Sequence, residues 1–223
     1  MKRLCIACEG LTEVSFVTQV IKPHLEDLAP GRVSVSAPNL KGYRTYSETK
    51  KFVKNLLPSH GSGATVTTMI DLFKIPGDYP GLAEASHMTP VERVNELERR
   101  FVEDVDDHRF FAYLQLHEFE ALAFADVEVL ASVLSPILGQ SAENLSEQFS
   151  KILDAAGHPE AIDDGHDTCP SRRIAKIVPA YKKRAQGPII TRRIGIEVLR
   201  NRCSHFGEWL SRLENLDAEK VYS

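Results

Sequence analysis

Short apolar segments alternate with amphipathic segments along the first half of the chain. Residues 4–8 form an apolar run bounded by Gly10, which is typical of a buried strand. Residues 14–28 then place apolar side chains three or four positions apart, which predicts a helix. This alternation continues with strands expected at 32–37, 65–70 and 109–116, and helices at 47–57 and 90–105. The order predicts an α/β fold with a mostly parallel four-stranded sheet flanked by helices.

Two of the expected helices have recognisable first residues. Ser47 is a suitable N-cap for the helix at 47–57. Thr89 is followed by Pro90 and, three residues after Thr89, by Glu92. This is the sequence of a capping box with proline in the first turn, so we expect a helix to start there.

Beyond residue 120 the pattern is helical throughout. Apolar spacing predicts five helices, at about 120–136, 143–156, 171–184, 191–202 and 204–215. We therefore expect an α/β domain over residues 1–125 and a helical C-terminal lobe over residues 126–223. The lobe is expected to pack on the domain to form one compact unit.

The composition is that of a soluble globular protein, with 43% hydrophobic and 26% charged residues. No apolar run approaches the roughly 20 residues needed to span a bilayer. The apolar stretch after the first three residues is too short for a signal peptide. These observations indicate a cytoplasmic protein that does not associate with a membrane.

Charge is unevenly distributed along the chain. Residues 169–223 hold 12 Lys and Arg against 5 Asp and Glu, whereas the remainder holds 15 against 26. One interpretation is a pair of complementary charged faces within one fold. The other is a basic C-terminal region that faces a polyanion such as a nucleic acid, across an acidic, metal-loaded site.

Acidic residues come at the ends of three predicted strands. Glu9 follows the first strand, with Glu13 one turn later; Asp71 follows the third, and Glu118 and Glu120 follow the fourth. In a parallel sheet these ends share one edge, where ligands bind. Carboxylates that converge there suit Mg²⁺ and phosphodiester chemistry. Each acid taken alone is also explained as a helix cap or a solvated loop residue.

Basic residues dominate residues 171–202, with ten Lys and Arg against the single acid Glu197. Arg172 and Arg173 follow Pro170 and Ser171 at an expected helix start. An arginine at that place can contact a phosphate or stabilise charge that develops in phosphoryl transfer. A solvated helix face explains most of the other bases.

Four segments of the sequence carry a family resemblance. They are residues 8–13 (CEGLTE), 67–71 (TTMID), 114–122 (LQLHEFEAL) and 170–173 (PSRR). The first two are similar to the Toprim domain of topoisomerases, primases and the overcoming-lysogenization-defect nucleases, the glutamate-rich first segment being nearest to the nucleases. All four together resemble domain of unknown function 4276, a bacterial Toprim-like family. This resemblance implies that the four-stranded sheet and the α/β domain over residues 1–125 are Toprim-like.

The resemblance implies roles for individual residues. Glu9 matches the Toprim glutamate, a metal ligand or general acid/base, and Glu13 matches the second acid of the nuclease branch. Asp71 matches the first aspartate of the Toprim Asp-x-Asp motif. Phe73 stands where that motif has its second aspartate, which is a departure from the family pattern.

A further ligand must therefore come from elsewhere in the chain. The candidates are Glu118, Glu120 and Asp78, with Arg172 or Arg173 as the phosphate contact. The departure at Phe73 counts against a two-metal nuclease and leaves a one-metal site, or a site that binds without cutting, open.

The function implied by the resemblance is a nuclease that uses Mg²⁺ or Mn²⁺ and acts on nucleic acid, with DNA preferred over RNA. The family is often encoded beside an ATPase in settings associated with phage defence, so an ATPase partner is expected. Two alternatives stay open. One is a non-catalytic subunit of an ATPase complex, which Phe73 favours. The other is a phosphotransferase or nucleotide hydrolase that uses the same acidic edge.

Overall fold

The computed structural model describes residues 1–42, 45–59, 63–73, 75–162, 165 and 167–216. The chain forms two compact units, Met1–Leu116 and His117–Ser223, which are called here the N-terminal and C-terminal units. The division falls at His117, whose backbone is left-handed with φ 60°. From the sequence, the change from sheet to helices was expected after residue 125.

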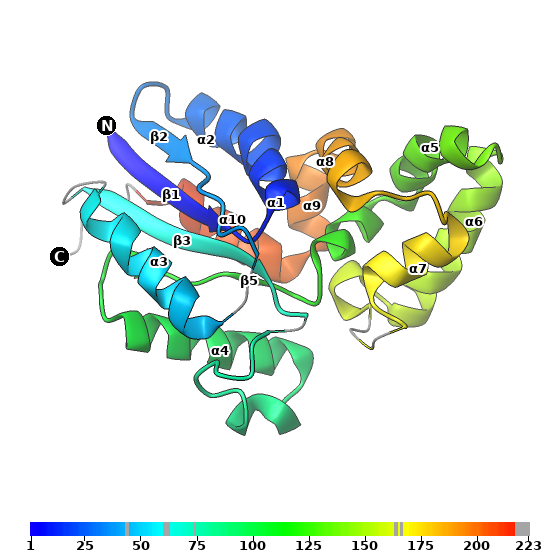
Figure 1. Cartoon of the computed structure of the whole chain (residues 1–223). Helices are drawn as coiled ribbons and strands as arrows, with labels where there is room; N and C mark the ends of the chain where they lie inside the picture. The colour runs from blue at the N-terminus through cyan, green and yellow to red at the C-terminus, as the bar shows by residue number, and fades with distance from the viewer. Residues whose placement is uncertain (43–44, 60–62, 74, 163–164, 166, 217–223) are drawn as a thin grey trace. The chain divides into compact units, whose positions relative to one another are not determined.

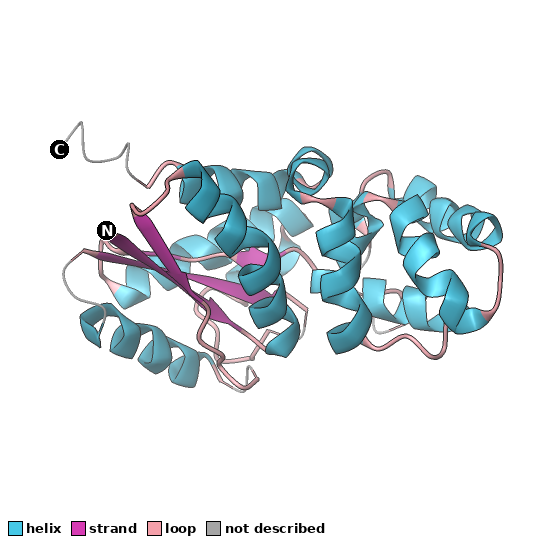
Figure 2. Cartoon of the chain, turned by 90° about the horizontal axis from the view of Figure 1, so that it is seen from above, coloured by secondary structure: helices cyan, strands magenta, loops and turns pink. Residues whose placement is uncertain are grey.

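A parallel sheet forms the centre of the N-terminal unit. Its strands are β1 (Lys2–Cys8), β2 (Val33–Ser36), β3 (Ala64–Asp71), β4 (Phe110–Phe111) and β5 (Leu114–Gln115). The order is β2-β1-β3-β4, β5 also pairs with β3, and all of these pairs are parallel. Figure 2 shows the strands fanned by the usual twist. The predicted α/β fold with a parallel sheet is thus confirmed.

One continuous helical segment connects β1 to β2. It consists of α1 (Leu11–Phe16), a π-helical turn (Val17–Ile21) and α2 (Lys22–Leu28). It begins three residues before the predicted helix at 14–28, because Gly10 serves as its N-cap. The π-helical turn inserts one wider turn that apolar spacing alone does not reveal.

The two other main helices of this unit are α3 (Tyr46–Ser59) and α4 (Pro90–Val105), with a short 3-10 helix (Glu84–His87) between them. Right-handed crossovers place α3 and α4 on the face of the sheet opposite α1 and α2. Figure 1 shows α3 alongside β3, with α4 near it. Apolar side chains of the sheet, α3 and α4 form one buried core that includes Cys5, Val66, Ile70, Val53, Leu97 and Phe101.

The predicted strand at 109–116 is wrong as a single element, since it is interrupted between β4 and β5. The reason lies in β3, where the Thr68 hydroxyl accepts a hydrogen bond from the Tyr113 amide and donates to the Tyr113 carbonyl, both at 2.9 Å. A side chain thus takes the place of the backbone partner at Tyr113, and the ladder resumes at Leu114.

The starts of α3 and α4 test the two predicted caps. The Thr89 hydroxyl accepts from the Glu92 amide and Glu92 reaches back to the Thr89 amide, which confirms the capping box of α4. The Ser47 cap is wrong, because α3 begins at Tyr46 and Thr45 accepts from the Glu48 amide at 3.1 Å. Ser and Thr are both favoured N-caps and Ser is the stronger of the two, so local preference alone pointed to Ser47 rather than Thr45.

The described elements of the C-terminal unit are all helical. They are a 3-10 helix (Phe119–Ala125), α5 (Val127–Leu138), α6 (Ala142–Ala156), a second 3-10 helix (Pro159–Ala161), α7 (Pro170–Ile177), α8 (Lys183–Ile194), α9 (Ile196–Arg202) and α10 (Ser204–Glu214). All seven residues of the first 3-10 helix are buried. Helices α5 and α8 pack against it, and α5 also packs against α6.

Three predicted helices of this unit need correction. The one at 120–136 is broken at Asp126, whose side chain caps α5. The one at 171–184 ends at Ile177, because Val178 precedes Pro179 and a residue before proline is disfavoured in the α conformation. The one at 191–202 is split by Gly195, which has φ 82° and separates α8 from α9.

Among the described residues, no single helix is long and apolar enough to cross a membrane. The pair Phe119–Ala125 and Val127–Leu138 reaches the required length and composition only when taken together, and it is bent by 106°.

Candidate functional site

Glu9 and Asp71 come together at the carboxyl edge of the sheet. Glu9 directly follows β1, and Asp71 is the last residue of the adjacent strand β3. The Asp71 amide donates a hydrogen bond to Glu9 Oε2 at 2.9 Å, and the Glu9 amide donates to the Met69 carbonyl at 3.0 Å. Asp71 is only 7% exposed. The side chain of one acid is thus bonded to the backbone of the other, at the ends of two adjacent strands.

Glu13 lies in the turn that follows Glu9. Its Oε2 accepts the Gly10 amide at 3.0 Å, which closes the first turn of α1. A Cβ at Gly10 would lie 3.2 Å from the same oxygen, so glycine favours this close approach. Glu13 is 3% exposed, and its charge adds to burial in raising the pKa of the Cys8 thiol. Glu13 therefore contributes negative charge near the end of β1 and also supports the turn.

The loop after β2 is bonded to the same strand end. The Leu40 amide donates to the Cys8 carbonyl at 2.9 Å, and the Gly42 amide donates to the Glu9 carbonyl at 3.0 Å. These loop residues were not among the site residues predicted from the sequence. The signal available in the sequence was the glycine at position 42. Gly42 has φ 102°, a backbone conformation that favours glycine.

Asp78 and Phe73 lie after β3. The Asp78 carboxylate accepts the Tyr46 amide at 2.9 Å and the Ser47 amide at 3.3 Å, at the start of α3. These hydrogen bonds lower the pKa of Asp78. Asp78 thus serves as a helix cap from outside the helix, which gives it a structural explanation, and we do not retain it as a metal ligand. Phe73 is half-buried.

Glu118 lies in the C-terminal unit at the start of α7. It is 7% exposed, and its Oε2 accepts the Ser171 amide at 2.9 Å. The next residue, Arg172, is exposed, whereas the Arg173 guanidinium donates through Nε to the Thr168 carbonyl at 2.5 Å. Arg173 thus holds the turn before α7, and Arg172 is the arginine presented to solvent.

Glu120 is a fully buried acid with basic and phenolic neighbours. Its side chain is 0% exposed, Lys183 Nζ lies 3.2 Å from Oε2, and the Tyr181 hydroxyl donates to Oε1 at 3.2 Å. Burial, followed by the charge of Glu120, raises the pKa of Tyr181 well above its usual value. The lysine compensates for the burial of this carboxylate, so within the C-terminal unit Glu120 has a structural explanation. Whether Glu118 or Glu120 acts with Glu9 and Asp71 stays a prediction.

Glu160 is a third buried acid of this unit, and the sequence analysis did not single it out. Its carboxylate accepts the His205 and Phe206 amides, both at 3.0 Å, at the start of α10. Its sequence separation from α10 hides this role, because no local capping motif links the two.

The basic residues of the C-terminal unit are largely exposed. Seven of the ten lysines and arginines between residues 171 and 202 are exposed: Arg172, Lys176, Lys182, Arg184, Arg192, Arg193 and Arg202. The other three have partners within the unit. Arg173 donates to the Thr168 carbonyl, Lys183 pairs with Glu120, and Arg200 pairs with Glu214. Exposed charge of one sign on α7, α8 and α9 suits contact with a polyanion.

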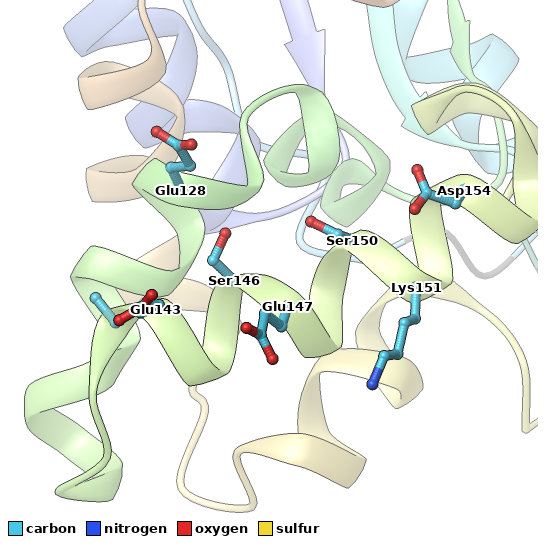
Figure 3. Close-up of a pocket in the computed structure, with 8 residues that line it drawn as sticks. Glu128, Glu143, Ser146, Glu147, Ser150, Lys151 and Asp154 are labelled. Carbon is cyan, nitrogen blue, oxygen red and sulfur yellow. The ribbon is translucent and has the colours of Figure 1, made fainter.

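A groove of about 680 Å³ lies on α5 and α6 of the same unit. Figure 3 shows Ser146, Ser150 and Asp154 along the side of α6 that faces Glu128. Glu143 and Glu147 also line the groove, and Lys151 is the one base among the described residues of its lining. This acidic lining disfavours a phosphate ligand, so we do not assign the nucleic-acid contact to it.

The donor set at Glu9 and Asp71 fits a divalent cation. No group of three or more His, Cys, Asp or Glu side chains is placed to hold a metal ion among the residues that the structure describes. Mg²⁺ is commonly held by one or two carboxylates, with waters and substrate phosphates completing its ligands. Two carboxylates at one sheet edge match this mode, whereas they do not form a metal cage made by protein alone.

Comparison with known proteins identifies the family. The model of the domain of unknown function DUF4276 matches residues 8–214, and the chain belongs to this family. No curated protein matches at a significant level.

Two solved structures are similar to the chain. The C-terminal region of the OLD protein of Xanthomonas campestris pv. campestris has a TM-score of 0.45 and 15% identity, covering 95% of this chain and 97% of that one. The C-terminal region of the Burkholderia pseudomallei OLD protein has a TM-score of 0.46 and 17% identity, covering 94% and 99%.

Proposed function

We propose that this member of the DUF4276 family is a divalent-metal-dependent enzyme that cleaves phosphodiester bonds in nucleic acid. The observation that carries the proposal is the hydrogen bond from the Asp71 amide to Glu9 Oε2 at 2.9 Å. It fixes two acids at the carboxyl edge of a parallel sheet, where α/β proteins bind their ligands.

Glu9 and Asp71 would hold Mg²⁺ or Mn²⁺. The bound ion would supply a Lewis acid for a phosphoryl oxygen and lower the pKa of water. Because Glu9 is held through the amide of Asp71, the glutamate carboxylate is fixed relative to the end of β3. Glu13 adds negative charge beside this pair and closes the turn that carries Glu9.

Exposed cations of the C-terminal unit would bind the nucleic-acid backbone. Arg172 is the first choice for a specific phosphate contact, because it is exposed next to the Glu118-capped start of α7. The surrounding lysines and arginines would provide affinity that is independent of sequence and falls with salt. DNA as the preferred substrate, an ATPase partner and a role in phage defence are parts of the proposal supported only by the family resemblance.

Cleavage by the purified protein tests this proposal. We expect Mn²⁺-dependent cleavage of a single-stranded or plasmid DNA substrate that is abolished by EDTA. Glu9→Gln and Asp71→Asn should each lower the rate by roughly 10²–10⁴-fold, because each removes a carboxylate that holds the metal. Gel analysis of the products with RNA as a parallel substrate would define the substrate class.

Matched variants in α2 provide the control. Glu26→Gln and Asp27→Asn make the same chemical changes away from the carboxyl edge of the sheet and should leave the rate unchanged. Cleavage that survives Glu9→Gln would indicate a contaminating nuclease and refute the proposal.

A non-catalytic subunit is the second candidate, and Phe73 in place of the second Toprim aspartate favours it. In that case, the acids would support the sheet edge and the chain would dock on an ATPase. Calorimetric titration distinguishes the two, because a subunit without a metal site shows no saturable Mn²⁺ binding up to millimolar concentration.

A further inference from the structure

A small cavity lies in the N-terminal unit between the loop after β2 and helix α3. Its volume is about 330 Å³, within the range of sites that hold small molecules. Among the described residues, its lining consists of Leu40, Lys41, Gly42, Glu48, Thr49 and Phe52. Neither the sequence motifs nor the proposed metal site accounts for this cavity.

The cavity is built onto the end of β1. Its loop wall is bonded to the Cys8 and Glu9 carbonyls through the Leu40 and Gly42 amides. The same Glu9 accepts the Asp71 amide through its side chain. The cavity wall is therefore bonded to Glu9, which the proposed function requires. A ligand in the cavity would be next to the acidic edge.

Both walls are held in place by specific contacts. Lys41 has a left-handed backbone with φ 61°, and its amide donates to Asn39 Oδ1 at 2.7 Å, which fixes the turn. On the α3 side, the Tyr46 hydroxyl donates to Asp104 of α4 at 2.6 Å, and the Tyr46 ring packs on Phe101 with centroids 5.2 Å apart. The cavity is thus supported by the core of the unit.

The cavity is lined by an aromatic, a cationic and an anionic side chain, and this combination restricts the kind of ligand that fits. Phe52 is a half-buried aromatic ring, Lys41 is an exposed cation and Glu48 is an exposed anion. A bare phosphate would meet the Glu48 carboxylate, and an apolar ligand would leave both charges without use. A nucleotide satisfies all three, since it combines a flat base for Phe52, N–H donors for Glu48 and a phosphate for Lys41.

We infer that this cavity is a nucleobase subsite that receives one nucleotide of the substrate beside the Glu9–Asp71 edge. The inference rests on the proposed function and adds a prediction of which part of the substrate is recognised there. Phe52 stacks on the base, and Lys41 contacts a phosphate of the same strand. A single unstacked base fits a cavity of this size, so single-stranded nucleic acid is the substrate form that this subsite accepts.

Two small substrates with the same leaving group separate base recognition from phosphodiester chemistry. They are the p-nitrophenyl ester of thymidine 5′-phosphate and methyl p-nitrophenyl phosphate, assayed with Mn²⁺. Phe52→Leu keeps the apolar bulk and removes the aromatic face. We expect it to raise KM for the thymidine ester roughly 5- to 150-fold with kcat unchanged, which corresponds to the usual worth of one stacked base. The methyl ester should be hydrolysed as by the parent protein.

Phe52→Tyr provides the matched control, because it retains the aromatic face and should restore KM for the thymidine ester. Unchanged kinetics for the thymidine ester in Phe52→Leu would overturn the subsite while leaving the nuclease proposal intact. An equal loss on both esters would also overturn it, since it would indicate a structural role for Phe52.

If the parent protein hydrolyses neither ester nor any oligonucleotide, the proposed function fails, and binding tests the subsite alone. Anisotropy of a fluorescein-labelled oligothymidylate should then show weaker binding to Phe52→Leu than to Phe52→Tyr. Equal binding to the two variants would refute the subsite.

Discussion

Helix starts and the carboxyl edge of the sheet use the same interaction, a carboxylate that accepts a backbone amide, for different ends. At helix starts, Glu118 and Glu160 accept amides of α7 and α10 in the C-terminal unit, and Asp78 accepts amides of α3 in the N-terminal unit. At the sheet edge, Glu9 accepts the amide of Asp71, which is itself an acid. The first arrangement places a negative charge at the positive end of a helix dipole, and the second places two acids side by side.

The difference shows how to separate a structural acid from a candidate ligand. A helix start offsets the charge of one carboxylate and needs no further cation. Two neighbouring carboxylates repel each other, and a divalent cation relieves that repulsion. The identity of the residue that donates the amide is therefore as informative as the burial of the acid.

The largest expected effect comes from removing an acid that caps a helix. Glu160→Ala should lower the free energy of unfolding by roughly 3 kcal/mol, because it leaves the His205 and Phe206 amides buried without their acceptor. Urea denaturation followed by circular dichroism measures the loss. Glu143→Ala, an exposed acid in α6, should change the value by less than about 0.5 kcal/mol. Equal effects of the two substitutions would show that Glu160 does not support α10.

The next effect concerns the acids at the sheet edge and the stability that a bound metal ion would add. At a Mn²⁺ concentration about 100 times the dissociation constant, the parent protein should gain about 2.7 kcal/mol, because the ion binds only the folded state. Glu9→Gln should abolish this gain. Glu118→Gln should retain it if Glu118 is only the cap of α7. Thermal unfolding with and without Mn²⁺ provides the measurement, and a gain that persists in Glu9→Gln would place the metal elsewhere.

The smallest effect concerns an acid paired with a cation. Asp107 forms an ion pair with Arg109 at 2.6 Å, and the arginine side chain lowers the pKa of Asp107 to about 2. Since the carboxyl group of an unfolded chain titrates near 3.9, the pair stabilises the protein above that pH, and this contribution disappears as the pH falls toward 2. Asp107→Asn should therefore lose at most about 1 kcal/mol at pH 6, given the partial exposure of the pair.

Chemical denaturation at several pH values checks this expectation. The difference between the parent protein and Asp107→Asn should narrow as the pH decreases from 6 toward 2. Asp106→Asn is the matched control, because Asp106 is exposed and asparagine also accepts its left-handed backbone. A difference that stays constant with pH would exclude the ion pair as its source.

The sequence predicted the parallel sheet and its principal helices because apolar periodicity and capping residues are local signals. The junction of Glu9 and Asp71 was also within reach, since parallel strands end at one edge. The interruption at Tyr113 was not, because it depends on the Thr68 hydroxyl, 45 residues away in sequence. Pro179 did carry a local signal, and apolar spacing was given more weight than the proline.

The candidate site shows the same limit. The roles of Glu160 at α10, Asp78 at α3 and Lys183 at Glu120 all arise from tertiary contacts that bring distant residues together. An acidic residue in a sequence can be a ligand, a cap or an ion-pair partner, and only its spatial neighbours distinguish these. The cavity at Phe52 likewise requires the loop after β2 to fold back onto Cys8 and Glu9.

The bond between Glu9 and Asp71 has a consequence for the biosynthesis of this protein. It joins residues that are 62 positions apart, so the acidic edge does not exist until β3 has been synthesised and has paired with β1. Closing so long a loop costs conformational entropy before any sheet contact offsets it. A nascent chain that carries only β1, α1, α2 and β2 thus has the CEGLTE motif without the bond between Glu9 and Asp71, and the proposed cleavage activity would begin only after the third strand is in place.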